Sequence, residues 1–169
     1  MIKLAFAFCL ALVSCVFGEV VRGVVVSVHD GDTLTLQCAD GLRLKLRLYG
    51  IDAPELKQPF GEECRDALER LVGGREVTAD VVGHDRYRRS IAVVRCGPTC
   101  ANETQVATGL SWWYARYAKK DSRLKILEAE ARWMRIGLWS EDSAVAPWEW
   151  RRCAGTGVRR SQMVFTGGN

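Results

Sequence analysis

The sequence lacks the residues of an ordinary zinc site. It contains only two histidines, His29 and His84, and each stands alone. Among its seven cysteines, Cys96 and Cys100 form a Cys-x3-Cys pair. A structural zinc site of this kind needs a second pair of ligands, and the sequence offers none. Composition therefore argues against zinc as a structural element.

Long apolar runs are also missing. The longest run, Leu4 to Val13, is shorter than the roughly 20 residues that a helix needs to cross a bilayer. It follows Lys3 and leads to small residues that end at Gly18, which is the layout of a secretory signal peptide over residues 1–18. Leu12-Val13-Ser14-Cys15 resembles a bacterial lipoprotein box, so an envelope protein with a lipidated Cys15 is the alternative. We therefore expect a secreted or periplasmic protein, or else a membrane-anchored lipoprotein.

The remaining chain has little net charge and no internal repeat or linker. The formal charge is +4, and residues 151–169 alone carry four arginines and no acidic residue. We therefore expect one near-neutral domain over residues 19–150, followed by a basic, disordered tail over residues 151–169. No long apolar surface segment favours a dimer, so a monomer is expected.

Cleavage after Gly18 would leave an odd number of cysteines. Cys96 and Cys100 flank the turn Gly97-Pro98-Thr99, which would bring their Cα atoms close enough for a disulfide in an oxidising compartment. We therefore expect this pair as a possible disulfide, with at least one other thiol left unpaired within the chain.

Acidic residues gather at the ends of two short apolar stretches. Asp32 follows the run 24–28, whereas Asp52 and Glu55 follow the run 42–48, which contains Arg47. Pairing of these strands would bring the carboxylates to one edge, where they repel one another unless a cation lies among them. Carboxylate oxygens suit a hard cation such as calcium or magnesium. Asp-Gly and Asp-x-Pro-Glu are also common turns, but a turn alone does not account for both Arg47 and Glu55.

These residues carry a family resemblance. Asp30-Gly31-Asp32-Thr33, followed by the segment 47–55 (RLYGIDAPE), resembles the first motif of the staphylococcal nuclease (thermonuclease) family. The segment 85–89 (DRYRR) resembles the second, with Arg88 where glycine is usual. Segments 109–117 and 137–140 are also similar to family members, so the resemblance covers about residues 20–150.

The apolar pattern predicts five strands and three helices. The strands are expected at 21–28, 34–38, 42–49, 76–82 and 90–96, and the helices at 60–72, 100–109 and 121–136. Spacing alone does not select their topology. The resemblance does: it implies an α+β, mainly β, fold with a five-stranded OB-fold barrel and about three helices.

The resemblance also implies a chemistry and a role for each site residue. It implies a calcium-dependent nuclease that hydrolyses DNA and RNA with little sequence specificity and leaves 3'-phosphate ends. One calcium ion, rather than magnesium, would be bound by Asp32, Asp52 and the Ala53 carbonyl. The implied catalytic residues are Glu55, as general base, with Arg47 and Arg89 on the phosphate; the implied substrate contacts are Arg86, Tyr87 and Tyr117. A noncatalytic OB-fold module that binds nucleic acid or protein is the alternative, although degenerate copies would be expected to lose the metal and base residues retained here.

Two further expectations concern arginine and tryptophan residues. If the usual glycine at position 88 has a backbone shape closed to most side chains, Arg88 would strain the loop or move Arg89. Arg89 remains the expected catalytic arginine.

Trp133 and Trp139 are expected in the core, and the segment 148–152 is expected to pack the chain end onto the domain.

Overall fold

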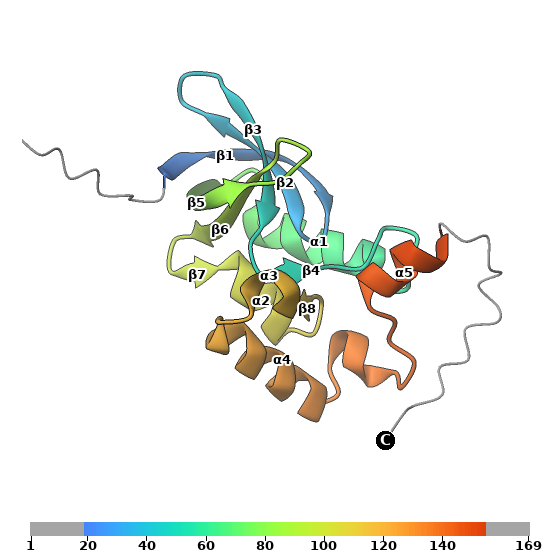
Figure 1. Cartoon of the computed structure of the whole chain (residues 1–169). Helices are drawn as coiled ribbons and strands as arrows, with labels where there is room; N and C mark the ends of the chain where they lie inside the picture. The colour runs from blue at the N-terminus through green and yellow to red at the C-terminus, as the bar shows by residue number, and fades with distance from the viewer. Residues whose placement is uncertain (1–18, 155–169) are drawn as a thin grey trace, which may run out of the picture.

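The computed structural model describes residues 19–154, and its centre is a barrel of five long strands (Figure 1). These strands are β1 (Glu19–Asp30), β2 (Thr33–Cys38), β3 (Arg43–Leu48), β5 (Glu76–His84) and β6 (Ser90–Cys96). Neighbours in the order β3-β2-β1-β5-β6 are antiparallel, and a parallel pairing of β3 with β6 closes the barrel. The expected five-stranded OB-fold barrel is therefore confirmed.

Alternating apolar side chains fill the barrel. Leu34 and Leu36 of β2 and Leu46 and Leu48 of β3 are almost completely buried. The period-2 pattern read from the sequence explains this, because every second residue of a strand faces the same side. Leu42 does not follow the pattern: it precedes β3 and is 54% exposed.

Three helices pack on the barrel or on one another, as expected. They are α1 (Gly61–Val72), α2 (Ala101–Ala107) and α4 (Ser122–Trp133). Helix α1 buries Cys64, Leu68 and Val72, which recur every four residues on one face and pack toward β1. Helix α2 lies between α1 and α4 and contacts both. The structure adds short elements, which are α3 (Ala115–Ala118), α5 (Pro147–Ala154), β4 (Ile51–Asp52), β7 (Thr99–Cys100), β8 (Trp112–Trp113) and the 3-10 helix η1 (Gly137–Ser140).

A second, aromatic core lies outside the barrel. The rings of Trp112 and Trp139 meet edge to face with centroids 4.3 Å apart, and Trp148 contacts Trp112 at 5.6 Å. The expectation of a buried Trp139 is confirmed, whereas that for Trp133 is wrong, because Trp133 is 85% exposed. It follows the buried Ala131 by two residues, which places it on the opposite face of α4.

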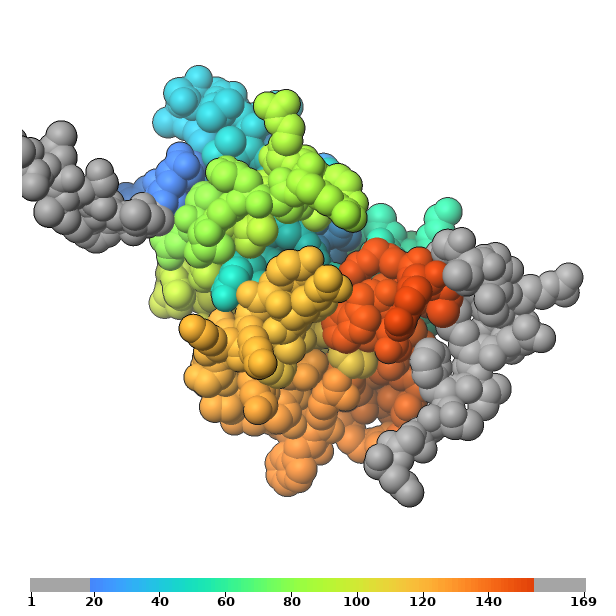
Figure 2. All heavy atoms as spheres, viewed as in Figure 1, coloured from blue at the N-terminus to red at the C-terminus, as the bar shows by residue number. Residues whose placement is uncertain are grey.

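The segment 148–152 packs the chain end onto the domain, as expected, but the folded region extends past the predicted domain boundary. Helix α5 crosses the predicted domain boundary at residue 150, so Arg151 and Arg152 belong to the folded domain and not to a tail. Figure 2 shows this helix, in red, on the surface beside the residues of α3. The predicted signal peptide and the rest of the predicted tail lie outside the described residues. Within residues 19–154, no helix has the length and apolarity needed to span a bilayer.

Cys96 and Cys100 are both thiols in the structure. Cys96 pairs with Thr99, and Arg95 pairs with Cys100, in the β6–β7 hairpin. Because neighbouring residues of a strand point to opposite faces, Cys96 and Cys100 lie on opposite sides of this hairpin. The expected Cys96–Cys100 disulfide is therefore not present in the structure. Burial raises the pKa of the Cys64 thiol to about 12, which keeps it protonated and inert.

Candidate active site

A glycine, Gly31, allows the turn that carries Asp32 to pack against the segment that carries Asp52. The turn at Gly31 packs so tightly that a Cβ atom at this position would lie 2.6 Å from the Ala53 Cβ and 2.7 Å from the Cys64 Cβ. This close approach allows the Ala53 backbone N–H to donate to the Asp32 Oδ2 at 2.7 Å. The absence of a side chain at Gly31 thus sets Asp32 beside β4, which carries Asp52.

Arg47 joins the two buried carboxylates. Its guanidinium donates to the Asp52 Oδ1 at 2.7 Å and forms an ion pair with Asp32. Asp32 is 4% exposed and Asp52 is fully buried. Burial lowers the pKa of Arg47, while the charges of Asp52 and Asp30 oppose this shift. Two buried carboxylates are stable here because a cation pairs with both of them.

Glu55 follows β4 in a loop, and an arginine from the far end of the chain contacts it. The Arg151 Nη1 lies 2.7 Å from the Glu55 Oε1, and the Arg151 Nη2 lies 2.7 Å from the Asp52 Oδ2. Burial alone would lower the pKa of Arg151, but hydrogen bonds to Asp52 and Glu55 outweigh it and raise this pKa. Sequence analysis expected the segment 148–152 to pack onto the domain but counted Arg151 in the basic tail, and it did not predict this contact. No local spacing signals a contact between residues so distant in the chain.

The β5–β6 loop presents Arg89 toward the acidic residues. The Asp85 carboxylate accepts hydrogen bonds from the Tyr87 backbone N–H and from the backbone and side chain of Arg89. Burial alone would raise the pKa of Asp85, but these bonds lower it. The Arg89 Nη1 lies 3.4 Å from the Thr33 hydroxyl oxygen, next to Asp32. Arg47 on β3 and Arg89 in the β5–β6 loop therefore approach the carboxylates from two different elements.

Arg88 has the backbone conformation that the usual glycine would favour. Its φ is 64°, and its N–H donates to the Asp85 carbonyl at 3.1 Å while the Arg89 carbonyl accepts from the Asp85 N–H. This is a three-residue hairpin loop that ends in a left-handed residue. The side chain of Arg88 is exposed. The loop therefore keeps its shape without glycine, and Arg89 is the arginine that reaches Thr33.

The expected substrate-binding residues lie at the surface in two places. Arg86 donates to the Tyr87 hydroxyl at 2.6 Å within the β5–β6 loop, and Tyr87 is 64% exposed. Tyr117, in α3, is 66% exposed, and its ring contacts that of Tyr114 at 5.0 Å. The structure thus brings Arg86, Tyr87 and Arg89 together and holds Tyr117 on a different element.

Comparisons with known proteins agree with this site and fold. The family model described as "Staphylococcal nuclease homologue" matches residues 45–141, which is more than half of the chain. The chain belongs to the staphylococcal nuclease family. The match includes Arg47, Asp52 and Glu55 and the β5–β6 loop with Arg89, whereas Asp32 and Arg151 lie outside the matched range.

Relatives of this staphylococcal nuclease homologue occur in bacteria and plants. The chain is 37% identical over 162 residues to "Protein ParB" of Escherichia coli, which covers 90% of this chain and 91% of that protein. It is 37% identical over 143 residues to "Micrococcal nuclease" of Shigella flexneri, covering 79% and 82% of the two chains. It is 38% identical over 110 residues to "Staphylococcal-like nuclease CAN1" of Arabidopsis thaliana, covering 65% of this chain but 34% of the plant protein.

The acidic residues of this nuclease homologue suit a hard cation. Among residues 19–154, no group of three or more His, Cys, Asp or Glu side chains is arranged around a common point for a metal ion. The expected ligand set is smaller, with two carboxylates, Asp32 and Asp52, and the backbone carbonyl of Ala53. Both carboxylates are buried and already hold guanidinium groups, which shows that this place attracts positive charge. Oxygen donors of this kind fit calcium or magnesium and not a soft metal.

Three buried amides hold the loops of the nuclease homologue, and sequence analysis missed them. Gln105 donates to the carbonyls of Gly31 and Cys64, at 2.8 and 3.0 Å, and thereby fixes the turn before Asp32. Asn102 donates to the Tyr49 carbonyl at 2.9 Å, at the turn between β3 and β4. The available signal was a pair of amides three residues apart on a short helix, since such a pair shares one face.

The third amide, Gln58, connects the Glu55 loop to the chain end. Its side-chain oxygen accepts from the Glu55 N–H at 3.3 Å, and its Nε2 donates to the Val145 carbonyl at 2.5 Å. Gln58 is only 6% exposed. It therefore couples the position of Glu55 to the segment that leads into α5.

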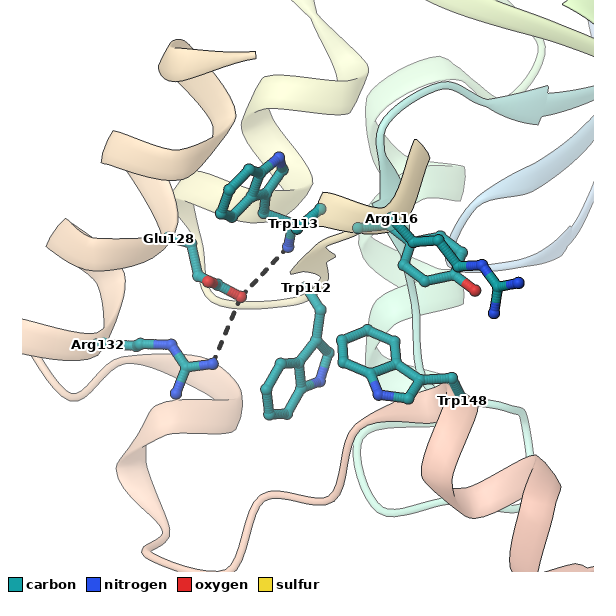
Figure 3. A pocket seen from close by; sticks show the side chains of 8 residues that line it. Trp112, Trp113, Arg116, Glu128, Arg132 and Trp148 are labelled. Carbon is teal, nitrogen blue, oxygen red and sulfur yellow. Dashed lines mark hydrogen bonds and ion pairs between the residues drawn. The ribbon is translucent and has the colours of Figure 1, made fainter. Parts of the chain in front are cut away.

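A pocket of about 500 Å³ lies among β8, α3, α4 and α5 (Figure 3). Its lining residues are Trp112, Trp113, Tyr114, Ala115, Arg116, Glu128, Arg132 and Trp148. The Glu128 carboxylate accepts from the Trp113 backbone N–H and from Arg132, as the dashed lines show. Burial raises the pKa of Glu128, against the opposing charge of Arg132. The Trp148 ring stacks on Tyr114 with centroids 5.3 Å apart, which docks α5 beside the acidic site.

Proposed function

We propose that this family member is an exported, calcium-dependent phosphodiesterase that hydrolyses DNA and RNA with little sequence specificity and leaves 3'-phosphate ends. Membership of the staphylococcal nuclease family makes it a nuclease that hydrolyses phosphodiester bonds. The calcium requirement, the products and export go beyond that membership. Export rests on the signal-peptide pattern of residues 1–18.

One observation carries the proposal: two buried carboxylates lie beside a more exposed carboxylate and two arginines. Asp32 and Asp52 are buried with Arg47 between them, whereas the Glu55 side chain is 43% exposed. This difference supports different roles, since buried oxygens suit a fixed ligand and an exposed carboxylate can reach water. A binding module would gain nothing from burying two acids next to each other.

The oxygens of Asp32, Asp52 and Ala53 are the proposed ligands of one calcium ion. Calcium bound there would offset the negative charge that grows on the phosphate oxygens during hydrolysis. Calcium is preferred to magnesium because it accepts carboxylate and carbonyl oxygens in a flexible geometry, whereas magnesium retains more of its water.

The side chains of the protein supply the other requirements of the reaction. Glu55 removes a proton from the attacking water, because an ionised, water-accessible carboxylate can act as a general base. Arg47 and Arg89 bind the phosphate oxygens, since guanidinium groups stay charged and match the phosphate geometry. Cleavage of the bond to the 5'-oxygen then leaves the phosphate on the 3' side.

The testing experiment measures cleavage of single-stranded DNA and RNA by the purified mature protein. Activity is compared in calcium, in magnesium and with chelator, for the wild type and for Glu55→Gln. We expect cleavage in calcium, loss with chelator, and a fall of about 100- to 10,000-fold in Glu55→Gln, the range for loss of a general base. End-group analysis of the products should find 3'-phosphates.

Glu62→Gln is the matched control, because Glu62 is an exposed acid on the first turn of α1. It should retain wild-type activity. Full cleavage in the presence of chelator would contradict the metal requirement. A folded wild type that binds DNA without cutting it would favour the noncatalytic module.

A further inference from the structure

Arg151 is hydrogen-bonded to both Asp52, the proposed metal ligand, and Glu55, the proposed general base. Its Nη2 lies 2.7 Å from the Asp52 Oδ2, and its Nη1 lies 2.7 Å from the Glu55 Oε1 and 3.3 Å from the Asp52 Oδ1. Arg47 takes the other side of Asp52, with its Nη2 2.7 Å from the Oδ1. Both oxygens of Asp52 are thus hydrogen-bonded to guanidinium groups.

A metal ion cannot join Asp52 while Arg151 remains in this position. Calcium binds carboxylate oxygens at about 2.3–2.6 Å, so an ion on the Oδ2 would lie within a few ångströms of the Arg151 guanidinium. The ion carries two positive charges and the guanidinium one, and the Asp52 carboxylate that both would contact is fully buried, so their repulsion at this short distance is not fully screened. One of the two cations must leave the carboxylate.

Arg151 can leave without undocking its helix. Trp148 lies one turn before Arg151 on α5, and its ring stacks on Tyr114 and meets Trp112 edge to face. These contacts hold α5 independently of the guanidinium. The Arg151 side chain is 44% exposed, so it has solvent into which it can turn.

We propose that Arg151 is a built-in cation of the metal-free protein: it holds Asp52 and Glu55 in place and competes with the metal ion for them. Without it, a fully buried acid and its acidic neighbour would face each other with Arg47 as the main remaining cation. When the metal ion binds, it replaces the Arg151 guanidinium, and the carboxylates of Asp52 and Glu55 are already in place. Arg151 is a positioning residue in this role, and the inference rests on the metal site proposed above.

The experiment measures calcium binding by titration calorimetry, without any substrate, in the wild type, Arg151→Ala and Arg152→Ala. Loss of a competing pair of charge-assisted hydrogen bonds should tighten calcium binding in Arg151→Ala by about tenfold or more. Arg152 is the matched control: it is the next residue, it carries the same charge, and it forms a 3.8 Å ion pair with Glu149 on its own helix and not with Asp52 or Glu55. Arg152→Ala should bind calcium like the wild type.

Melting temperatures with and without calcium provide a second readout. Arg151→Ala should melt lower than the wild type in chelator, because Asp52 and Glu55 lose their partner, and should equal or exceed it in saturating calcium. A residue that merely supports the fold would lower both values. Arg151→Lys, which keeps the charge but not the two-pronged contact, should fall between Arg151→Ala and the wild type in calcium affinity.

Three outcomes would overturn the inference. Unchanged or weaker calcium binding in folded Arg151→Ala and Arg151→Lys would show that Arg151 does not compete with the metal. An equal gain in Arg152→Ala would assign the effect to overall charge. If no protein of the set binds calcium, the proposed calcium site fails and this inference fails with it, whereas equal binding by all of them overturns the role of Arg151 alone.

Discussion

Arg88 adopts a left-handed backbone conformation that is unfavourable for a residue with a side chain. A φ of 64° is costly for any residue with a Cβ atom. The loop nevertheless holds, because Asp85 accepts the backbone N–H groups of Tyr87 and Arg89 and binds the Arg89 side chain. The cost is therefore local, and the side chain that matters, Arg89, stays directed toward Thr33 and Asp32.

Arg88→Gly should stabilise the protein without reducing nuclease activity. Glycine removes a left-handed penalty of about 1–2 kcal/mol, from which the greater freedom of glycine in the unfolded chain subtracts about 0.4–1 kcal/mol. We expect the free energy of unfolding to rise by about 0.5–1 kcal/mol in urea titrations. Arg88→Ala is the control for charge, because it removes the guanidinium but keeps the Cβ atom, and it should give no such gain.

The catalytic arginine is tested by two alanine variants. Arg89→Ala should lose about 100- to 1000-fold in the rate of cleavage. A comparable loss in Arg88→Ala alone would assign the catalytic role to Arg88.

At the scale of single elements, the strands were predictable and the loops were only partly so. The alternation of β3 and the helical spacing of α1 predicted both elements, because burial on one face imposes these periods on the sequence. The acidic segments were also predictable as a group, since each directly follows an apolar strand. The positions of the loops were not predictable, because they depend on Gln58, Gln105 and Asn102. The partners of these amides are backbone groups, which have no signature in the sequence.

The same limit explains the errors on Trp133 and on α5. Trp133 was assigned by residue type, whereas its exposure depends on which face of α4 meets the rest of the fold. Arg151 was included in the segment 148–152 that was expected to pack onto the domain, but it was also assigned to the tail by composition, since basic residues amid Gly, Thr and Ser resemble one. Its true position depends on the docking of Trp148, which is a tertiary contact.

Gln58→Ala should weaken both the loop that carries Glu55 and the reaction that depends on it. The change removes a hydrogen bond from the Glu55 N–H and one to the Val145 carbonyl. We expect a loss of about 1–3 kcal/mol in the free energy of unfolding, the cost of leaving buried partners unpaired. A shift of Glu55 of about 1 Å would also lower kcat up to about 100-fold, measurable in a steady-state cleavage assay.

Gln37→Ala is the matched control for Gln58→Ala. Gln37 lies on β2, away from the site, and its side chain accepts an exposed hydrogen bond from Arg43 at 3.3 Å. It should change the free energy of unfolding by less than about 0.5 kcal/mol and leave kcat unaffected. If Gln58→Ala behaves the same way, Gln58 does not position Glu55.

At the scale of the whole molecule, the candidate site draws on both ends of the folded chain. Asp32 follows β1 at the start, Asp52 and Glu55 come from β4 and the loop after it, and Arg151 comes from the last helix. Trp148 and Arg151, one turn apart on α5, contact the aromatic core and the acidic residues respectively. The aromatic core outside the barrel thus serves to hold the chain end against the site.

Truncation should reveal this division between barrel and chain end. A chain that ends after Ala154 retains every contact described for α5 and should match the full-length protein in stability and calcium affinity. A chain that ends after Ala146 loses Trp148 and Arg151, and we expect its free energy of unfolding in chelator to fall by about 3 kcal/mol, the usual scale for loss of a large aromatic contact. Its calcium affinity should rise like that of Arg151→Ala, since the competing cation is gone. Trp148→Ala separates the two effects, because it removes the stacking but not the guanidinium. Equal stability of the two truncated chains would show that α5 contributes nothing to the fold.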